Sequence, residues 1–388
     1  MKIIRTSTIA TSLDVLLKGQ LAFLNKHYEI IAISGQDKHL EIVKEREKIN
    51  TISVVMKRNI SPLRDLKSLW LLYCVFEKEK PQIVHSITPK AGLLSMIAAK
   101  FADVPIRIHT FTGLIFPSKT GCIQKLLIKM DKILCWAATV IISEGNGVKQ
   151  DLEAYKITNK PLKILANGNV NGIDTTFFSP SLYTKDPQQK LRVQLGISKE
   201  DFVFVFVGRL VSDKGINELV KAFKGLTSQP VNRSIHYKLL LVGPLETELD
   251  PLQDKTLKEI ESNPTIITTG FQPDVRPYFA ISNALVFPSY REGFPNVVMQ
   301  AGAMGLPSIV TDINGCNEII EDGKNGLIIP PKDTKALQEK MLRLMEDEQL
   351  YKHLASNSRE MITSRYEQKL VWEALLEEYK RLLVNSGQ

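Results

Sequence analysis

Two cations stand in a glycine-flanked loop directly after a buried strand. The apolar run Phe202–Val207 predicts the strand, and it leads into Gly208, Arg209 and, five residues further on, Lys214. A forked guanidinium and a compact ammonium in one such loop suit a diphosphate. An ordinary strand-to-helix connection with surface charges is the alternative for this loop taken alone.

A second loop follows another apolar run, at residues 284–287, and carries one acid, Glu292. Pro295 suits the first turn of a helix, and Gly305 is typical of a helix end, so a short helix is expected between them. The open N–H groups of its first turn would attract a phosphate. The alternative interpretation of Glu292 is an ordinary acid at a helix N-terminus, which the helix dipole favours. The residues predicted to line this site are Gly208, Gly293, Phe294, Pro295, Asn296, Val297 and Val298.

Taken together, the two loops closely resemble the motifs of the family 4 glycosyltransferases, which have the GT-B fold. The resemblance covers nearly the whole chain and is strongest from about Ala166 to Asp333. It includes Asn171–Asp174, which looks like the family's entry to the interdomain linker. The motifs are specific for the family and not for the sugar.

The resemblance implies an α/β protein of two doubly wound Rossmann-like domains that face each other across a cleft. Residues 1–180 would form the acceptor-side domain, and residues 181–367 would bind the nucleotide sugar. A C-terminal helix at about 368–388 would pack back on the first domain. The alternation of predicted strands and helices independently favours doubly wound sheets.

By the same resemblance, Arg209, Lys214 and Glu292 are the catalytic residues. The two cations would neutralise the leaving diphosphate, and Glu292 would contact the donor sugar. The family's second acid in this motif binds the ribose hydroxyls, and its position is Gln300 here. An amide oxygen still accepts a hydroxyl hydrogen bond, but without the strength that a charge adds.

Three residues in the first half are acceptor-side candidates. Thr112 holds the position at which the family often has a histidine beside the transferred sugar, and His109 lies three residues earlier, inside a predicted strand. A core histidine is the main alternative for His109. His85, at the end of the preceding strand, is the better candidate for the cleft, although a buried strand-end histidine fits its position equally well. The first loop, Thr6–Ser12, lacks the glycines usual in the family.

The implied reaction is a retaining transfer of a sugar from a nucleoside diphosphate, UDP rather than GDP, to an acceptor hydroxyl. The runs at 88–92 and 109–113 look most like bacterial enzymes that build capsule, O-antigen or protein glycans on polyprenyl diphosphate. Gln300 and Thr112 motivate an alternative: a degenerate, non-catalytic protein that binds a sugar nucleotide or acts as a scaffold. A nucleotide-sugar epimerase of the same fold is a third interpretation.

Composition sets further limits on function. The 388 residues, 44% hydrophobic and 24% charged, are typical of a globular protein of two domains. No apolar run is long enough to span a bilayer, no signal peptide is evident, and four cysteines without metal or disulfide spacing favour a reduced, cytoplasmic location. Without Asp-x-Asp or a His/Cys cluster, neither a metal nor another cofactor is expected, the nucleotide sugar being a co-substrate.

Positive charge is concentrated in the first half, where residues 1–180 hold 25 Lys+Arg against 15 Asp+Glu. This excess suits an anionic partner, and without recognition motifs nucleic acid is not expected. Leu114–Trp136 pairs apolar positions with Lys125, Lys129 and Lys132, which predicts peripheral contact with the inner face of the cytoplasmic membrane. A core-packed helix with a solvated lysine row is the alternative. Trp70–Tyr73 is expected in the core.

Several elements are expected from local patterns. A helix is predicted over Leu13–Asn25 with Ser12 as its cap, and a polar linker over Thr184–Lys190. The last helix is expected over Gln368–Asn385. Strands are predicted at residues 3–4, 29–34, 52–55, 83–85, 106–110 and 140–143, and again at 202–207, 238–242, 265–268, 284–288, 307–310 and 326–329.

Overall fold

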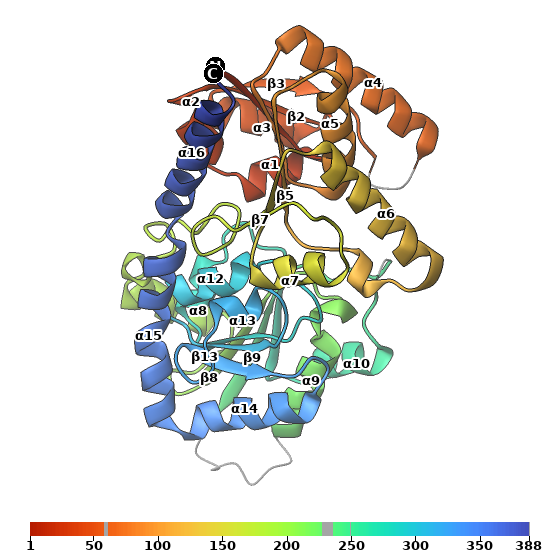
Figure 1. Ribbon diagram of the computed structural model, residues 1–388. Coiled ribbons are helices and arrows are strands. Elements are labelled where there is room, and N and C mark those ends of the chain that lie inside the picture. The colour runs from red at the N-terminus through yellow and green to blue at the C-terminus, as the bar shows by residue number, and fades with distance from the viewer. Residues whose placement is uncertain (58–60, 227–235, 249, 388) are drawn as a thin grey trace. The chain divides into compact units, whose positions relative to one another are not determined.

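The computed structural model describes residues 1–57, 61–226, 236–248 and 250–387 (Figure 1). It divides into two compact units. The first comprises Met1–Gly172 with Gln368–Gln388, and the second comprises Ile173–Glu367. The sequence placed this boundary at residue 180.

The first unit is built on a parallel sheet in the order β3-β2-β1-β4-β5-β6-β7. From β1 the chain steps outward to β2 and β3, then crosses back to β4 on the other side of β1. The carboxyl ends of β1 and β4 therefore flank a topological switch point, where open α/β sheets bind ligands. The strands are β1 Lys2–Thr6, β2 Glu29–Ser34, β3 Asn50–Ser53, β4 Ile83–Ser86, β5 Ile106–Phe111, β6 Val140–Ser143 and β7 Leu162–Lys163.

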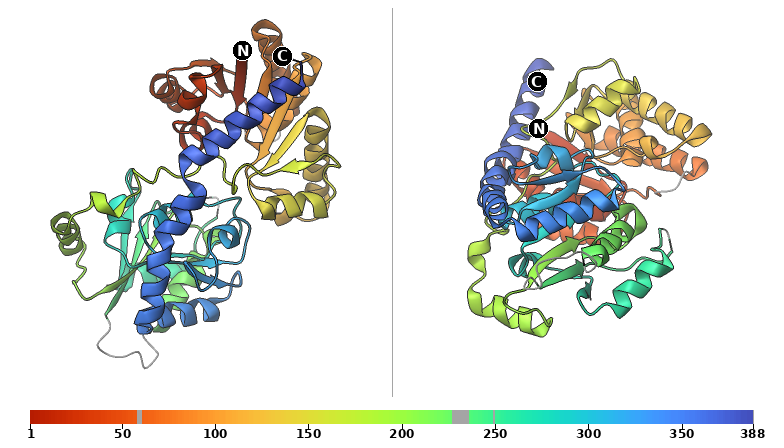
Figure 2. Two further views of the ribbon diagram at one scale, coloured as in Figure 1. Left: turned by 60° about the vertical axis from the view of Figure 1, so that its left-hand side comes forward. Right: turned by 90° about the horizontal axis from the view of Figure 1, so that it is seen from below.

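Helices cover this sheet, and the last helix of the chain belongs to the same unit (Figure 2). The helix predicted over Leu13–Asn25 is two helices, because the first ends at Leu16 and Gly19, in a left-handed conformation (φ 80°), caps the start of the second. Ile9, not Ser12, is the cap residue. The helices are α1 Ala10–Leu16, α2 Gln20–Asn25, α3 Lys38–Glu47, α4 Pro62–Glu79, α5 Pro89–Phe101, η1 Phe116–Ser118, α6 Gly121–Ala137, α7 Asn146–Ala154 and α16 Gln368–Asn385.

The second unit repeats the design with a parallel sheet in the order β10-β9-β8-β11-β12-β13. Its switch point lies between β8 and β11, where Phe204 pairs with Ala284. Both faces of β8 are covered: Val203, Phe204, Val205 and Phe206 are fully buried, as its continuous apolar run predicts for a parallel sheet. The strands are β8 Phe202–Val207, β9 Tyr237–Val242, β10 Ile266–Gly270, β11 Ala284–Phe287, β12 Ser308–Thr311 and β13 Gly326–Ile329.

The helices of the second unit include one that the sequence analysis missed. Residues predicted as a polar linker begin α8, in which Arg192 donates to the carbonyls of Ile281, Ser198 and Asp201 and so ties a largely polar helix to the unit. The helices are η2 Pro180–Leu182, α8 Lys185–Gln194, η3 Ser212–Lys214, α9 Ile216–Leu226, α10 Asp254–Ser262, α11 Arg276–Ala280, α12 Asn296–Ala303, α13 Cys316–Ile319, α14 Thr334–Glu346 and α15 Glu348–Tyr366.

One expectation about apolar side chains was wrong in part. Trp70 and Tyr73, predicted in the core, are 63% and 36% exposed, and only Leu72 of that run is fully buried. On α6, Leu134 is buried, but Ile123 and Ile133 are exposed on the helix that carries the three lysines. No helix in the described part of the chain is long and apolar enough to span a membrane.

Candidate active site

The two motif loops of the second unit lie side by side at its switch point. They extend from the carboxyl ends of β8 and β11, which are neighbouring strands. The amide of Tyr290 donates to the carbonyl of Asp213 at 2.9 Å, and the ammonium of Lys214 pairs with the carboxylate of Glu292. The sheet order thus brings together the cation of one motif and the acid of the other.

Gly215 makes this close approach possible. It has a left-handed conformation (φ 71°), and a Cβ atom added to it would lie 2.1 Å from the carbonyl oxygen of Pro288. Any other residue would therefore force the two loops apart. Gly315 plays a comparable part behind the second loop, where an added Cβ would meet the Gly293 carbonyl oxygen at 2.5 Å.

Both predicted diphosphate cations have carboxylate partners in this structure. The guanidinium of Arg209 contacts Glu246, in the loop after β9, at 2.5 Å, and its side chain is 54% exposed. The side chains of Lys214 and Glu292 are 20% and 17% exposed. Glu292 also accepts a hydrogen bond from the Ser289 hydroxyl at 2.8 Å. A diphosphate entering here would compete with two carboxylates for these cations.

The helix after the second loop begins one residue later than predicted. Pro295 is the residue that caps α12, in an extended conformation, and Asn296 opens the helix. The amide of Val298 donates to the Pro295 carbonyl at 3.2 Å, so that predicted phosphate donor is engaged within the turn. The first turn still lies next to Glu292, at the carboxyl end of β11.

Two other predicted donor-site residues differ in their surroundings. Phe294 is 5% exposed and packs edge-on against Tyr366, with ring centroids 5.5 Å apart, so its ring anchors the loop in the core. Gln300 lies half-buried on α12, eight positions after Glu292 in the sequence. Gly208, at the start of the first loop, has a positive φ of 151°.

Sequence reasoning missed Glu246 and Ser289. Ser289 is fully buried, and its carbonyl accepts a hydrogen bond from Thr311 at 2.5 Å, which fixes the loop that carries Glu292. Its position directly before Tyr290–Gly293 could have indicated a supporting role. Nothing in the sequence around Glu246 indicates that it pairs with Arg209, because that contact depends on the neighbouring strands β8 and β9.

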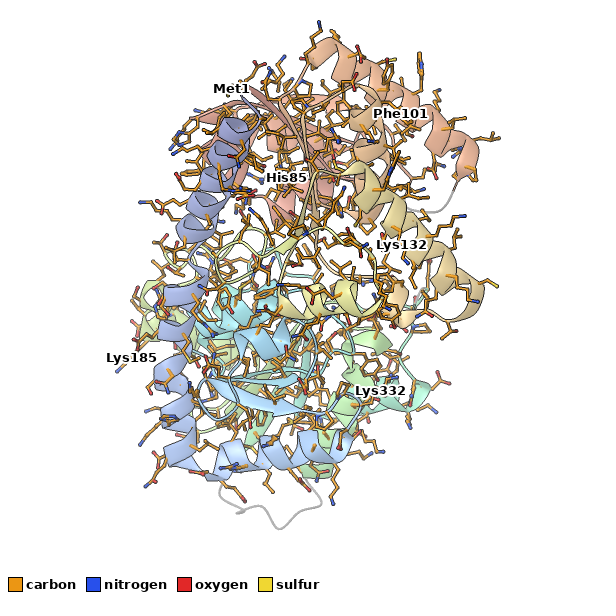
Figure 3. The ribbon with its side chains drawn as sticks, in the orientation of Figure 1. Met1, His85, Phe101, Lys132, Lys185 and Lys332 are labelled. Carbon is orange, nitrogen blue, oxygen red and sulfur yellow. The ribbon has the colours of Figure 1, made fainter. Side chains whose placement is uncertain are left out.

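His85 is buried inside the first unit, among its strands (Figure 3). Its Nδ1 lies 2.6 Å from the Tyr379 hydroxyl of α16, and its Nε2 lies 2.7 Å from the Thr110 hydroxyl of β5. Burial, together with nearby Arg5, lowers the pKa of His85 well below its ordinary value. Both nitrogens therefore serve to join the last helix to the sheet, which corresponds to the buried strand-end alternative.

His109 and Thr112 are likewise engaged within the fold. His109 is 1% exposed, lies 2.8 Å from the Ser86 hydroxyl, and burial lowers its pKa to about 3. It is the core histidine of the alternative interpretation. The half-buried Thr112 donates to the Ile87 carbonyl at 2.9 Å, at the edge where β4 and β5 end.

A cavity of about 380 Å³ lies at the switch point of the first unit. It combines hydroxyls with an apolar wall, and it contains two ionisable groups, Lys90 and Asp131. Lys90 is bound by both oxygens of Asp65 at 2.9 Å, and burial raises the pKa of Asp131 to about 7. The residues that line the cavity include Thr8, Ser12, Thr88, Lys90, Leu127, Met130 and Asp131.

One part of this cavity had a signal in the sequence, and another part had none. The hydroxyl-rich loop Thr6–Ser12, which replaces the expected glycines, supplies three of the lining residues, Thr8, Ile9 and Ser12. Asp131 sits in the middle of a lysine-rich helix and had no distinguishing pattern. Within the described residues, no group of three His, Cys, Asp or Glu side chains is placed to hold a metal ion.

Comparison with known proteins relates both units to one family. A model described as glycosyl transferases group 1 matches residues 187–361, and one described as glycosyl transferase 4-like matches residues 9–145. The capsular polysaccharide biosynthesis glycosyltransferase CapM of Staphylococcus aureus is 33% identical over 99% of this chain and 98% of its own. The UDP-Gal:α-D-GlcNAc-diphosphoundecaprenol α-1,3-galactosyltransferase of Escherichia coli is 30% identical over 76% of this chain and 74% of its own.

Solved structures agree on the fold. A glycosyltransferase from Rickettsia africae superposes with a TM-score of 0.81 at 21% identity, covering 98% of both chains. Anabaena HepE in complex with UDP and glucose gives the same TM-score at 19% identity, covering 98% of this chain and 100% of its own. With its two doubly wound units and both family models matched, this chain belongs to the family 4-like, group 1 glycosyltransferases and has the GT-B fold.

Proposed function

We propose that this glycosyltransferase moves a sugar from a UDP-sugar to a hydroxyl of a lipid-linked glycan during synthesis of a surface polysaccharide. The observation that carries the donor half is the pairing of Lys214 with Glu292 at the switch point of the second unit, with Arg209 in the same loop as Lys214. Two cations there would stabilise charge on the departing diphosphate, and Glu292 would bind the sugar. Gln300 would accept from a ribose hydroxyl.

The acceptor half of the proposal is supported by relatives and by the cavity of the first unit. The E. coli relative is named for a sugar acceptor carried on diphosphoundecaprenol. The cavity between Thr8, Thr88 and Asp131 has both hydroxyls and apolar groups, a lining suited to a sugar with polar edges and apolar faces. It is a better acceptor candidate than His85 or His109, whose rings are engaged inside the fold.

We further propose that transfer retains the anomeric configuration and needs no metal. The leaving phosphate would take the acceptor proton, and the two cations with the α12 amino end would replace a metal at the diphosphate. The protein would work at the inner face of the cytoplasmic membrane, held there by the lysines of α6. Lys125, Lys129 and Lys132 are all exposed, as this requires.

A screen tests the proposal directly. The full chain is mixed with UDP- and GDP-sugars, first alone to measure binding and hydrolysis, and then with GlcNAc-diphosphoundecaprenol in detergent. Transfer from a UDP-sugar, with the new linkage in the donor's anomeric configuration by NMR, is the expected result. Tight donor binding without hydrolysis or transfer to any lipid-linked glycan would favour a binding protein, and donor isomerisation an epimerase.

A further inference from the structure

The first unit has an exposed apolar groove between α4 and α5. It encloses about 620 Å³, and it is lined chiefly by Leu63, Leu66, Leu69, Trp70, Tyr73 and Phe101. Leu63 is 86% exposed, and Leu66, Trp70 and Phe101 are each exposed by more than 60%. Phe101 is labelled in Figure 3 on the side of the unit where α4, α5 and α6 lie.

These side chains are not needed to hold α4 on the fold. The opposite face of α4 does that, through the buried Ser68, Leu72 and Phe76. A helix with one buried face normally turns charged and polar residues outward. Contiguous apolar groups on the outer face are a mark of an interaction surface.

The charges around the groove indicate the partner. Among the described residues of α4, α5 and α6, the exposed ionic side chains are six cations and a single acid, Glu77. The half-buried acids are accounted for otherwise: Asp65 binds Lys90, Glu79 binds Lys2, and Asp131 lines the cavity. The cations are Arg64, Lys67, Lys78, Lys125, Lys129 and Lys132. An apolar groove framed by cations complements an anionic lipid surface.

One contact links the end of the groove to the lysine-bearing helix α6. Lys100, next to Phe101 at the end of α5, lies over the ring of Trp136 with its ammonium 4.7 Å from the centroid. Trp136 is 57% exposed, and Leu126 and Ile133, which precede it on α6, are exposed as well. Tryptophan and lysine together are typical of the membrane interface.

We propose that the α4–α5 groove takes up lipid hydrocarbon chains, so that this face inserts into the anionic bilayer and is not held there by electrostatic attraction alone. The inference deepens the membrane part of the proposed function and rests on it. The two contacts differ in physics. Attraction by the α6 lysines is screened by salt, whereas burial of Leu66, Trp70 and Phe101 among lipid chains is not.

Vesicle co-sedimentation at low and high salt separates the two contacts. Wild type is expected to keep part of its binding to phosphatidylglycerol-containing vesicles at high salt. The Leu66→Ser/Trp70→Ser variant should lose this salt-resistant part, with a fall of about tenfold or more in the partition coefficient. Phe271→Ser, which removes a 73% exposed aromatic from the second unit, is the matched control and should bind like wild type.

Fluorescence shows which side chain enters the bilayer. In a Trp136→Phe variant, brominated lipid should quench Trp70, because the other tryptophan, Trp372, donates to Asn171 at 2.6 Å within the fold. Absence of quenching would overturn the inference. Since both serine positions are exposed, circular dichroism melting should match wild type and exclude a folding defect.

The remaining outcomes are equally decisive. Binding of the wild type at low salt with none at high salt would show that the lysines bind the membrane without the groove, and it would overturn the inference. Sedimentation unchanged by the double serine variant would overturn the inference. A lipid-free dimer of the wild type that the serine variant abolishes would assign the groove to a second copy of the chain. Sugar transfer to an acceptor in detergent is measured separately and does not depend on any of these results.

Discussion

The ammonium of Lys214 pairs with the carboxylate of Glu292, which lies 78 residues away in the sequence. The contact joins the loop after β8 to the loop after β11, and the Ser289 hydroxyl donates a hydrogen bond to the same carboxylate. A sugar diphosphate binding here would offer its phosphate oxygens to Lys214 and its hydroxyls to Glu292. Under the proposed function, the pair would hold both side chains in position until the donor replaces one partner for each.

Loss of either cation should reduce turnover far more than stability. Lys214→Ala and Arg209→Ala are each expected to lower kcat by about 10²–10³-fold, as for a preorganised charge donor. Each broken ion pair should cost about 1 kcal/mol of unfolding free energy or less, because these are partly exposed pairs. Lys221→Ala, an exposed lysine of α9, is the control. Wild-type turnover in either variant would rule out the diphosphate assignment.

Transfer should continue in excess EDTA. The physical reason is that two cations and the amino end of α12 would balance the charge that a metal otherwise carries. The measurement is the initial rate after chelation and dialysis, with and without added Mg²⁺ or Mn²⁺. Complete loss of activity, restored by one of these ions, would mean that the donor binds as a metal complex.

A restored acid at the ribose position should tighten donor binding. Gln300→Glu is expected to make the free energy of UDP-sugar binding more favourable by about 1 kcal/mol, because a neutral hydrogen bond becomes charge-assisted. Isothermal titration calorimetry measures the change, and Gln300→Ala gives the value without the contact. An unchanged or weaker affinity in the Glu variant would remove Gln300 from the ribose site.

Reversal of the α6 charges should release the protein from anionic vesicles. Lys125→Glu, Lys129→Glu and Lys132→Glu together remove attractions worth about 1 kcal/mol each near an anionic surface. Low-salt binding should fall steeply while thermal stability stays nearly unchanged. The same exchange at Lys199, Lys221 and Lys335, three exposed lysines of the second unit, should have little effect. Equal sedimentation of the two triple variants would contradict a membrane role for α6.

Asp131 should make the stability of the protein depend on pH. Burial raises its pKa from 3.8 to about 7, so the folded protein keeps a proton that the unfolded chain loses. Stability from this group is therefore present at low pH and declines as pH rises from about 4 through 7. Asp131→Asn, which mimics the protonated acid, should stabilise the protein at pH 8 and have little effect at pH 4.

Thermal melts across this pH range test the expectation, with Glu153→Gln, an exposed acid on α7, as the control. A uniform effect of Asp131→Asn at all pH values would show that the carboxyl is not protonated in the folded state. Acid-side losses from the buried His85 and His109, whose pKa values are lowered, run in the opposite direction and are common to both proteins.

The sequence by itself determined the strands of both sheets apart from the two-residue β7, and it singled out the two motif loops of the second unit. Buried parallel strands are continuous apolar runs, so β8, β11 and β13 were predictable within a residue or so. The long amphipathic α16 was predicted with its bounds. Local breaks were not: Gly19 divides a helix, and α8 is fixed by Arg192 bonds to distant carbonyls.

Only the tertiary structure decided which of the candidate site residues contact one another. Strand order placed Lys214 against Glu292 and Arg209 against Glu246, and no local pattern encodes a contact between loops of different strands. It also turned His85 and His109 into buried structural groups, since a strand's pattern does not tell whether a polar ring faces a cleft or a partner such as Tyr379. Likewise, α4 reads as an apolar helix in sequence, and only its packing on one face leaves Trp70 outside.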